Sequence, residues 1–199
     1  MARIAAVVCL MVVCVVFLPV ETAQARGLLG EQFAAAQLSF TRPGDAILRD
    51  IDDSVWGFGA RVNVPATERI DFSASLARTS LEGGSTDIDT STFLVGVNVM
   101  LSPLKPVCPF IIGRLGLLDT NPGDTDPMIS LGAGVQYDFM ENAALTPSLV
   151  FTHADDYDDV ILGLEGNYWF TDKVFGIAGL AVGIDSEDVG LTIGAGMRF

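Results

Sequence analysis

The chain has 199 residues, enough for one domain with a sizeable core, and its formal net charge is −14. Half of the residues are hydrophobic and only 18% are charged, a low charge content for a water-soluble domain, so we expect apolar surface outside the core. The acidic balance argues against nucleic acid as a partner, because nucleic-acid-binding proteins present a basic face.

The first 25 residues are typical of a secretory signal peptide. Arg3 is followed by an apolar run over residues 4–18, and the small-x-small site Ala23-Gln24-Ala25 follows. We predict a signal peptide over residues 1–25 and a mature domain over residues 26–199. A membrane anchor is the alternative, although the run is shorter than the ~20 residues that a span prefers. The predicted mature domain keeps one cysteine, Cys108, so no internal disulfide is expected.

The remaining chain alternates apolar and polar residues with a period of two, which predicts strands with two different faces. We expect ten strands, near residues 30–40, 54–64, 69–79, 90–101, 108–118, 127–139, 143–153, 159–170, 173–184 and 189–199. Each has about the ~9–11 residues that a tilted strand needs to cross a bilayer. The prediction is an all-β fold, an antiparallel up-and-down transmembrane β-barrel of about ten strands, with eight strands as the alternative.

The predicted connections alternate in length along the chain. The short ones cover residues 65–68, 102–106, 140–143 and 171–172, and the longer, more acidic ones cover residues 41–53, 80–89, 119–126, 154–158 and 185–188. Outer-membrane barrels have short turns in the periplasm and longer loops outside the cell. An even number of strands would place both ends of the domain on the periplasmic side.

Charged residues within the predicted strands share one face with glycine and small polar residues, and Arg78 is the exception. These charges are Arg61, Arg69, Asp71, Arg114, Asp138, Glu165 and Arg198. Aromatic residues form two predicted belts: Tyr137, Phe139, Tyr168, Phe170, Phe175 and Phe199 at the short turns, and Phe40, Trp56, Phe58, Phe93 and Phe151 toward the long loops. Two aromatic belts are typical of membrane barrels, so we expect the apolar face to point outward. A soluble periplasmic barrel that holds a lipid inside is the opposite alternative.

Three segments carry a resemblance to known proteins: Gly132-Ala133-Gly134-Val135-Gln136-Tyr137, Pro109-Phe110-Ile111-Ile112-Gly113 and the ending Gly194-Ala195-Gly196-Met197-Arg198-Phe199. The chain resembles the small outer-membrane β-barrel superfamily of Gram-negative bacteria, the opacity-type and adhesin-like barrels. The resemblance implies a place in the outer membrane, in contact with lipid and lipopolysaccharide. It also implies assembly by the outer-membrane insertion machinery, which would read the terminal Phe199. It fixes no molecular activity.

Four inward charges form the candidate polar cluster of the lumen: Arg61, Asp71, Arg114 and Glu165. We expect them to pair across the lumen, because buried charges need partners. A barrel of this size leaves little interior space, so the prediction is a polar plug or a very narrow channel. We expect no cofactor, although the acidic long connections would attract divalent cations weakly.

These features favour an integral barrel with a structural, surface-contact or narrow-pore role, and no catalytic residue is predicted. The alternative is an outer-membrane hydrolase, of the protease or lipid-A-modifying type. It would use His153, the one histidine of the chain, and the nearby loop carboxylates Asp155, Asp156, Asp158 and Asp159. A general base needs a partner within hydrogen-bond reach and a shaped substrate site.

Overall fold

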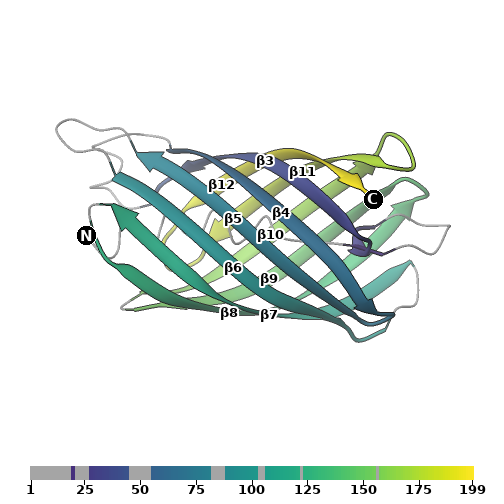
Figure 1. Ribbon diagram of the computed structural model, residues 1–199, viewed down its shortest axis with the longest axis horizontal. Coiled ribbons are helices and arrows are strands. Elements are labelled where there is room, and N and C mark those ends of the chain that lie inside the picture. The colour runs from purple at the N-terminus through teal and green to yellow at the C-terminus, as the bar shows by residue number, and fades with distance from the viewer. Residues whose placement is uncertain are drawn as a thin grey trace.

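The computed structural model describes residues 19–20, 27–44, 55–81, 88–102, 106–121, 123–155 and 157–199. Ten of its strands close into a barrel of tilted strands (Figure 1). They are β3 (Phe33–Arg42), β4 (Val55–Thr67), β5 (Ile70–Leu81), β6 (Ile88–Met100), β7 (Val107–Asn121), β8 (Thr125–Met140), β9 (Ala143–Ala154), β10 (Tyr157–Trp169), β11 (Val174–Gly183) and β12 (Val189–Arg198). The predicted all-β fold with ten strands is confirmed.

The barrel has up-and-down topology, because each strand pairs antiparallel with the next strand in the sequence. β12 pairs with β3 and closes the ring, from Arg198 beside Phe33 to Val189 beside Arg42. Both strands therefore meet at the short-turn end, where the C-terminus lies (Figure 1). Within the described ranges, no helix is long and apolar enough to cross a membrane.

The predicted signal peptide lies outside the described residues except for β1 (Pro19–Val20). This short strand pairs in parallel with β2 (Leu29–Gly30). The first strand was predicted to begin near residue 30, but it begins at Phe33. Residues 27–32 instead run inside the barrel, where their backbone is bound by side chains of the wall.

Two of the predicted long connections are short, which corrects the expected loops over residues 119–126 and 154–158. β7 and β8 remain paired as far as Asp119 and Thr125, and β9 and β10 as far as Ala154 and Tyr157. The Thr125 hydroxyl donates a hydrogen bond to Asp119 at 2.8 Å, so polar side chains support strand pairing here. The polar composition of these two segments led to the prediction of loops. Strand ends that project beyond the apolar wall have the same polar composition as loops.

The apolar face points outward. Trp56, Phe58 and Leu115 are 60–62% exposed, whereas Arg61 and Ser130 on the opposite face are at most 2% exposed. This arrangement rules out the soluble lipid-carrier alternative, which required the apolar face to be buried. An apolar outer band around a closed barrel with a polar interior is the arrangement of transmembrane β-barrels, whose closure leaves no unpaired strand edge in lipid.

Aromatic residues line the outer wall at both ends, as predicted, with one error. Phe40 packs against Trp56 toward the long loops, with ring centroids 5.0 Å apart, and Tyr168 packs against Phe170 at the short turns at 5.3 Å. Phe175 was predicted for the short-turn belt but is fully buried inside. It pairs with Gly196 of β12, and this pairing leaves room for an inward ring.

Arg78 breaks the apolar pattern because it lies beyond the belt, toward the long loops. Its guanidinium donates to Asp89 at 2.7 Å, and the Ser80 hydroxyl donates to the other carboxylate oxygen of Asp89 at 2.5 Å. All three side chains point outward on neighbouring positions of β5 and β6. They form a polar rim on the long-loop side of Leu76 and Phe93. Arg78 and Asp89 therefore lie beyond the apolar wall and do not interrupt it.

Candidate functional site

An ion pair crosses the lumen between two distant strands. Arg61 of β4 donates from Nη1 and Nη2 to the two carboxylate oxygens of Glu165 of β10, at 3.1 and 3.2 Å. Three strands, β11, β12 and β3, separate the partners on the shorter way around the ring. Both side chains are almost fully buried. Because a bidentate pair fixes both charges in one geometry, it joins two walls of the barrel across its interior.

Arg114 of β7 adds a second positive charge near Glu165, with which it interacts electrostatically. Of the four predicted residues, Arg61 is bound to Glu165 directly and Arg114 lies near it. Asp71 does not join this group. Its carboxylate accepts a hydrogen bond from the backbone N–H of Gly30 at 2.6 Å, closer to the short-turn end.

Aromatic rings fill the space beneath the ion pair. The Arg61 guanidinium carbon lies 5.7 Å from the centre of the Phe33 ring, within range of a cation–π contact. Phe33 meets Phe175 edge-on with centroids 5.4 Å apart, and Phe175 contacts Trp169 at 4.8 Å. A series of ring contacts, edge-on or tilted, thus extends from the ion pair to the short-turn mouth.

Two glycines make room for inward aromatic rings. Gly134 pairs directly with Phe110 across β7 and β8, and Gly196 pairs with Phe175 across β11 and β12. A Cβ atom at either glycine would overlap the partner's ring. Glycine at these positions lets a large ring lie flat against the neighbouring strand.

Residues 27–32, which we call the strap, cross the short-turn mouth inside the barrel. The Gln136 side-chain carbonyl of β8 accepts hydrogen bonds from the N–H groups of Leu28 and Leu29, at 2.8 and 3.0 Å. The Asn63 amide of β4 donates to the Glu31 carbonyl at 3.0 Å. At the far end, Phe199 N–H donates to the Gln32 carbonyl at 3.3 Å. Together with Asp71, side chains of three strands hold the strap by its backbone.

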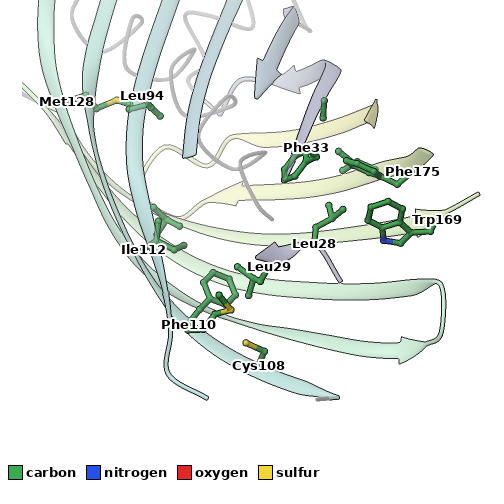
Figure 2. Close-up of a cluster of buried hydrophobic side chains, with 14 of the residues drawn as sticks. Leu28, Leu29, Phe33, Leu94, Cys108, Phe110, Ile112, Met128, Trp169 and Phe175 are labelled. Atoms are coloured by element: carbon green, nitrogen blue, oxygen red, sulfur yellow. The ribbon is translucent and has the colours of Figure 1, made fainter. Parts of the chain in front are cut away.

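The strap also contributes to an apolar cluster at the same mouth (Figure 2). Leu28 and Leu29 are at most 3% exposed, and Phe33, Phe110, Trp169 and Phe175 surround them. Cys108 belongs to this cluster and is buried, beside Phe110. Burial of each leucine contributes about 1.5–3 kcal/mol relative to an exposed side chain. The strap is therefore held at the mouth by apolar contacts as well as by hydrogen bonds.

The lumen half toward the long loops is lined differently. Many of its buried residues bear hydroxyl groups, including Ser39, Thr41, Thr79, Thr90, Thr92, Thr120, Ser130, Thr152 and Thr192. Ser130 and Thr152 lie within hydrogen-bond distance, 3.1 Å between their oxygens. Leu94 and Met128 extend the apolar cluster to this side (Figure 2). Uncharged hydroxyl groups favour a hydrated interior here, because buried polar groups need partners or water.

The sequence predicts a polar plug or a very narrow channel, and the described lumen contains apolar as well as polar side chains. Asn63 and Gln136 share the inward face of their strands with the charged residues, but the sequence does not indicate that they bind the strap. Leu28 and Leu29, set between Gly27 and Gly30 just before the first strand, were the available signal. Two leucines beside two glycines fit poorly with an outward lipid face and also with a polar loop.

His153 lies on the outer surface at the long-loop end of β9. Its Nδ1 is 2.7 Å from the Asp158 carboxylate, and both side chains are more than half exposed. The loop carboxylate Asp159 instead points inward and accepts hydrogen bonds from the N–H groups of Val160 and Asp185, at 2.6 and 3.0 Å. His153 and Asp159 therefore face opposite sides of the wall, and Asp156 lies outside the described residues.

The acidic rim is described only in part, since Asp45, Asp50, Asp52, Asp53, Glu82 and Asp87 lie outside the described residues. Asp188 is buried and accepts a hydrogen bond from Gly44 N–H at 2.6 Å. In the part of the chain that the structure describes, no three His, Cys, Asp or Glu side chains lie close enough to hold a metal ion.

No protein-family model matches the chain, and no curated protein sequence matches it. Solved structures do. The translocator domain of the autotransporter NalP from Neisseria meningitidis has a TM-score of 0.53 at 11% identity, covering 87% of this chain and 90% of that one. The fold is that of the outer-membrane β-barrels. The NanC porin, at 7% identity and a TM-score of 0.52, covers 83% of this chain and 100% of its own. At these identities the likeness concerns the fold.

Proposed function

We propose that the protein is a non-enzymatic barrel of the outer membrane that supports the envelope or contacts other surfaces, with a lumen that passes solutes poorly. Two layers of buried side chains across the lumen carry this proposal. The Arg61–Glu165 ion pair joins β4 to β10, and the strap and its aromatic neighbours lie beneath it at the mouth. A ten-stranded barrel has little spare width, so two such layers leave no wide aqueous path.

Conductance in planar bilayers tests the proposed closure. We expect the purified protein to give no large, stable current steps, while a porin reconstituted in the same way serves as the positive control. The folded state is checked beforehand by the change in gel mobility on boiling. A large and stable conductance of the folded protein would overturn the closed-lumen proposal.

The proposed surroundings follow from the two ends of the wall. The outer apolar band would contact membrane lipid, and the exposed rim of Arg78, Asp89 and Asp158 would lie among lipopolysaccharide head groups.

We propose weak binding of calcium or magnesium by exposed rim carboxylates, with no other cofactor. Isothermal titration with calcium should show weak binding in the millimolar range, and the complete absence of heat would remove this part of the proposal.

A further inference from the structure

We infer that the short-turn mouth of the barrel is a binding site for an extended peptide, occupied by the chain's own residues 27–32, and that this occupancy closes the mouth. The inference deepens the proposed closed lumen, on which it rests. It assigns the closure to a particular segment and to the wall residues that recognise it.

The course of the strap supports the inference first. It begins beside Gln136 of β8 and ends beside the junction of β12 and β3. β8 stands halfway around the ring from β3 in either direction. The strap therefore spans the barrel from one wall to the opposite wall. A terminal segment bound at one wall alone would leave the rest of the mouth open, whereas this one has partners on both sides of it.

The chemistry of recognition supports it next. Three wall side chains bind backbone groups of the strap: Gln136 accepts from two N–H groups, Asp71 accepts from Gly30, and Asn63 donates to the Glu31 carbonyl. Asn63 and Asp71 come from the consecutive strands β4 and β5, and Gln136 comes from the distant strand β8. Buried backbone polar groups need partners. Leu29 and Gly30 pair with β1, and side chains of the barrel wall bind further backbone groups of the strap. The site is thus suited to an extended peptide backbone.

The strap sequence fits this site at particular positions. Gly30 has a φ angle of 78°, in the left-handed region that side chains with a Cβ disfavour. Gly27 lies so close to the Gln136 amide that a Cβ atom would overlap it. Leu28 and Leu29 between them fill the apolar mouth. Arg198 adds a hydrogen bond to the Glu31 carboxylate at 3.3 Å, which fixes the end of the strap next to β3.

Cys108 provides a reporter for the occupied site. It faces the lumen at the register position of Gln136 and is buried in the same cluster as Leu29. With Cys9 and Cys14 replaced by serine, it is the single thiol of the full chain. A charged methanethiosulfonate reagent that cannot cross the bilayer reports whether water reaches this position.

Two variants displace the strap by different means. Gly30→Val changes only the strap, and Asn63→Ala/Asp71→Ala removes wall contacts away from Cys108. Ser130→Ala is the matched control, since it removes a lumen contact toward the long-loop end of the barrel. All are purified from membranes in detergent, and the gel shift on boiling confirms that each is folded.

We expect Cys108 labelling to be slow in the wild type and in Ser130→Ala, and about ten-fold or more faster in the strap variants, because reaction then needs no local opening. Acceleration in either folded strap variant, with the control unchanged, supports the inference. Equal rates in the wild type and the strap variants would overturn it, as would equal acceleration in the control. If Cys108 of the wild type reacts as fast as a free thiol, that result by itself would overturn the inference. Because this readout does not depend on conductance, it can fail separately from the proposed closed lumen.

Discussion

Arg61 and Glu165 hold the barrel together across its own interior, with both guanidinium Nη atoms bound to the two carboxylate oxygens at 3.1 and 3.2 Å. The pair lies directly above the ring of Phe33, so the charge network and the apolar mouth form one continuous filling. The energetic consequence differs between removing one partner and removing both.

Glu165→Leu should destabilise the barrel by about 3–5 kcal/mol, because it leaves the Arg61 charge buried without its main partner. The double variant Arg61→Met/Glu165→Leu should recover most of this loss, since two apolar side chains need no compensation there. The urea midpoint of the gel shift in micelles measures both. A single variant as stable as the wild type would contradict the assigned role of the pair.

Gly196→Ala should destabilise the barrel by about 1–3 kcal/mol, because the new methyl group overlaps the Phe175 ring, which Phe33 and Trp169 hold in place. Gly113→Ala is the matched control. Gly113 lies on the outer wall, and a Cβ there meets nothing closer than 3.9 Å. Thermal unfolding should therefore separate the two substitutions, and equal stability would show that Phe175 does not lie against Gly196.

Phe199→Ala, which keeps the backbone N–H bound to Gln32, should lower the amount of assembled barrel in cells while leaving refolding in micelles nearly unchanged. The side chain is 64% exposed on the outer wall, so its loss removes little packing. The expected defect thus lies in recognition by the insertion machinery. Boiled and unboiled membrane samples measure assembly, and an unchanged assembled fraction in cells would contradict the predicted insertion signal.

His153→Ala should change the unfolding free energy by less than about 1 kcal/mol, because its contact with Asp158 is exposed and surface ion pairs contribute little. The proposed non-enzymatic role also predicts equal results for the variant and the wild type in protease and lipid-A hydrolysis assays. A wild-type activity that disappears in His153→Ala would instead favour the hydrolase alternative.

The sequence was sufficient to predict the wall of the barrel. Trp56, Phe58 and Val62 alternate with Gly57, Gly59 and Arg61, and a period of two assigns each residue to a face without knowledge of its neighbours. The same local rule places Arg61, Arg114 and Glu165 inside. It cannot say which of them meet, because contact across the lumen depends on strand register and on barrel closure.

The sequence did not predict the strap or the inward position of Phe175, because both depend on contacts between distant parts of the chain. The partners of Leu28, Leu29 and Gly30 lie 41–108 residues away along the chain, so no local pattern indicates them. The position of Phe175 depends on the glycine that faces it on β12. Phe175 was assigned to the outer belt because it is aromatic and lies near a strand end. Aromatic residues are common both in such a belt and in an apolar plug, so composition does not distinguish the two.

The central claim is that the apolar face contacts lipid and the other face lines a closed lumen, and the two tryptophans of the chain test it directly. Trp56 is 62% exposed on the outer wall, and Trp169 is 3% exposed in the lumen. Trp169→Phe and Trp56→Phe each leave one of them for fluorescence in vesicles of brominated lipid. We predict strong quenching of Trp56 by the brominated acyl chains and little quenching of Trp169. Strong quenching of Trp169 with a protected Trp56 would contradict the orientation of the wall and the closure that depends on it.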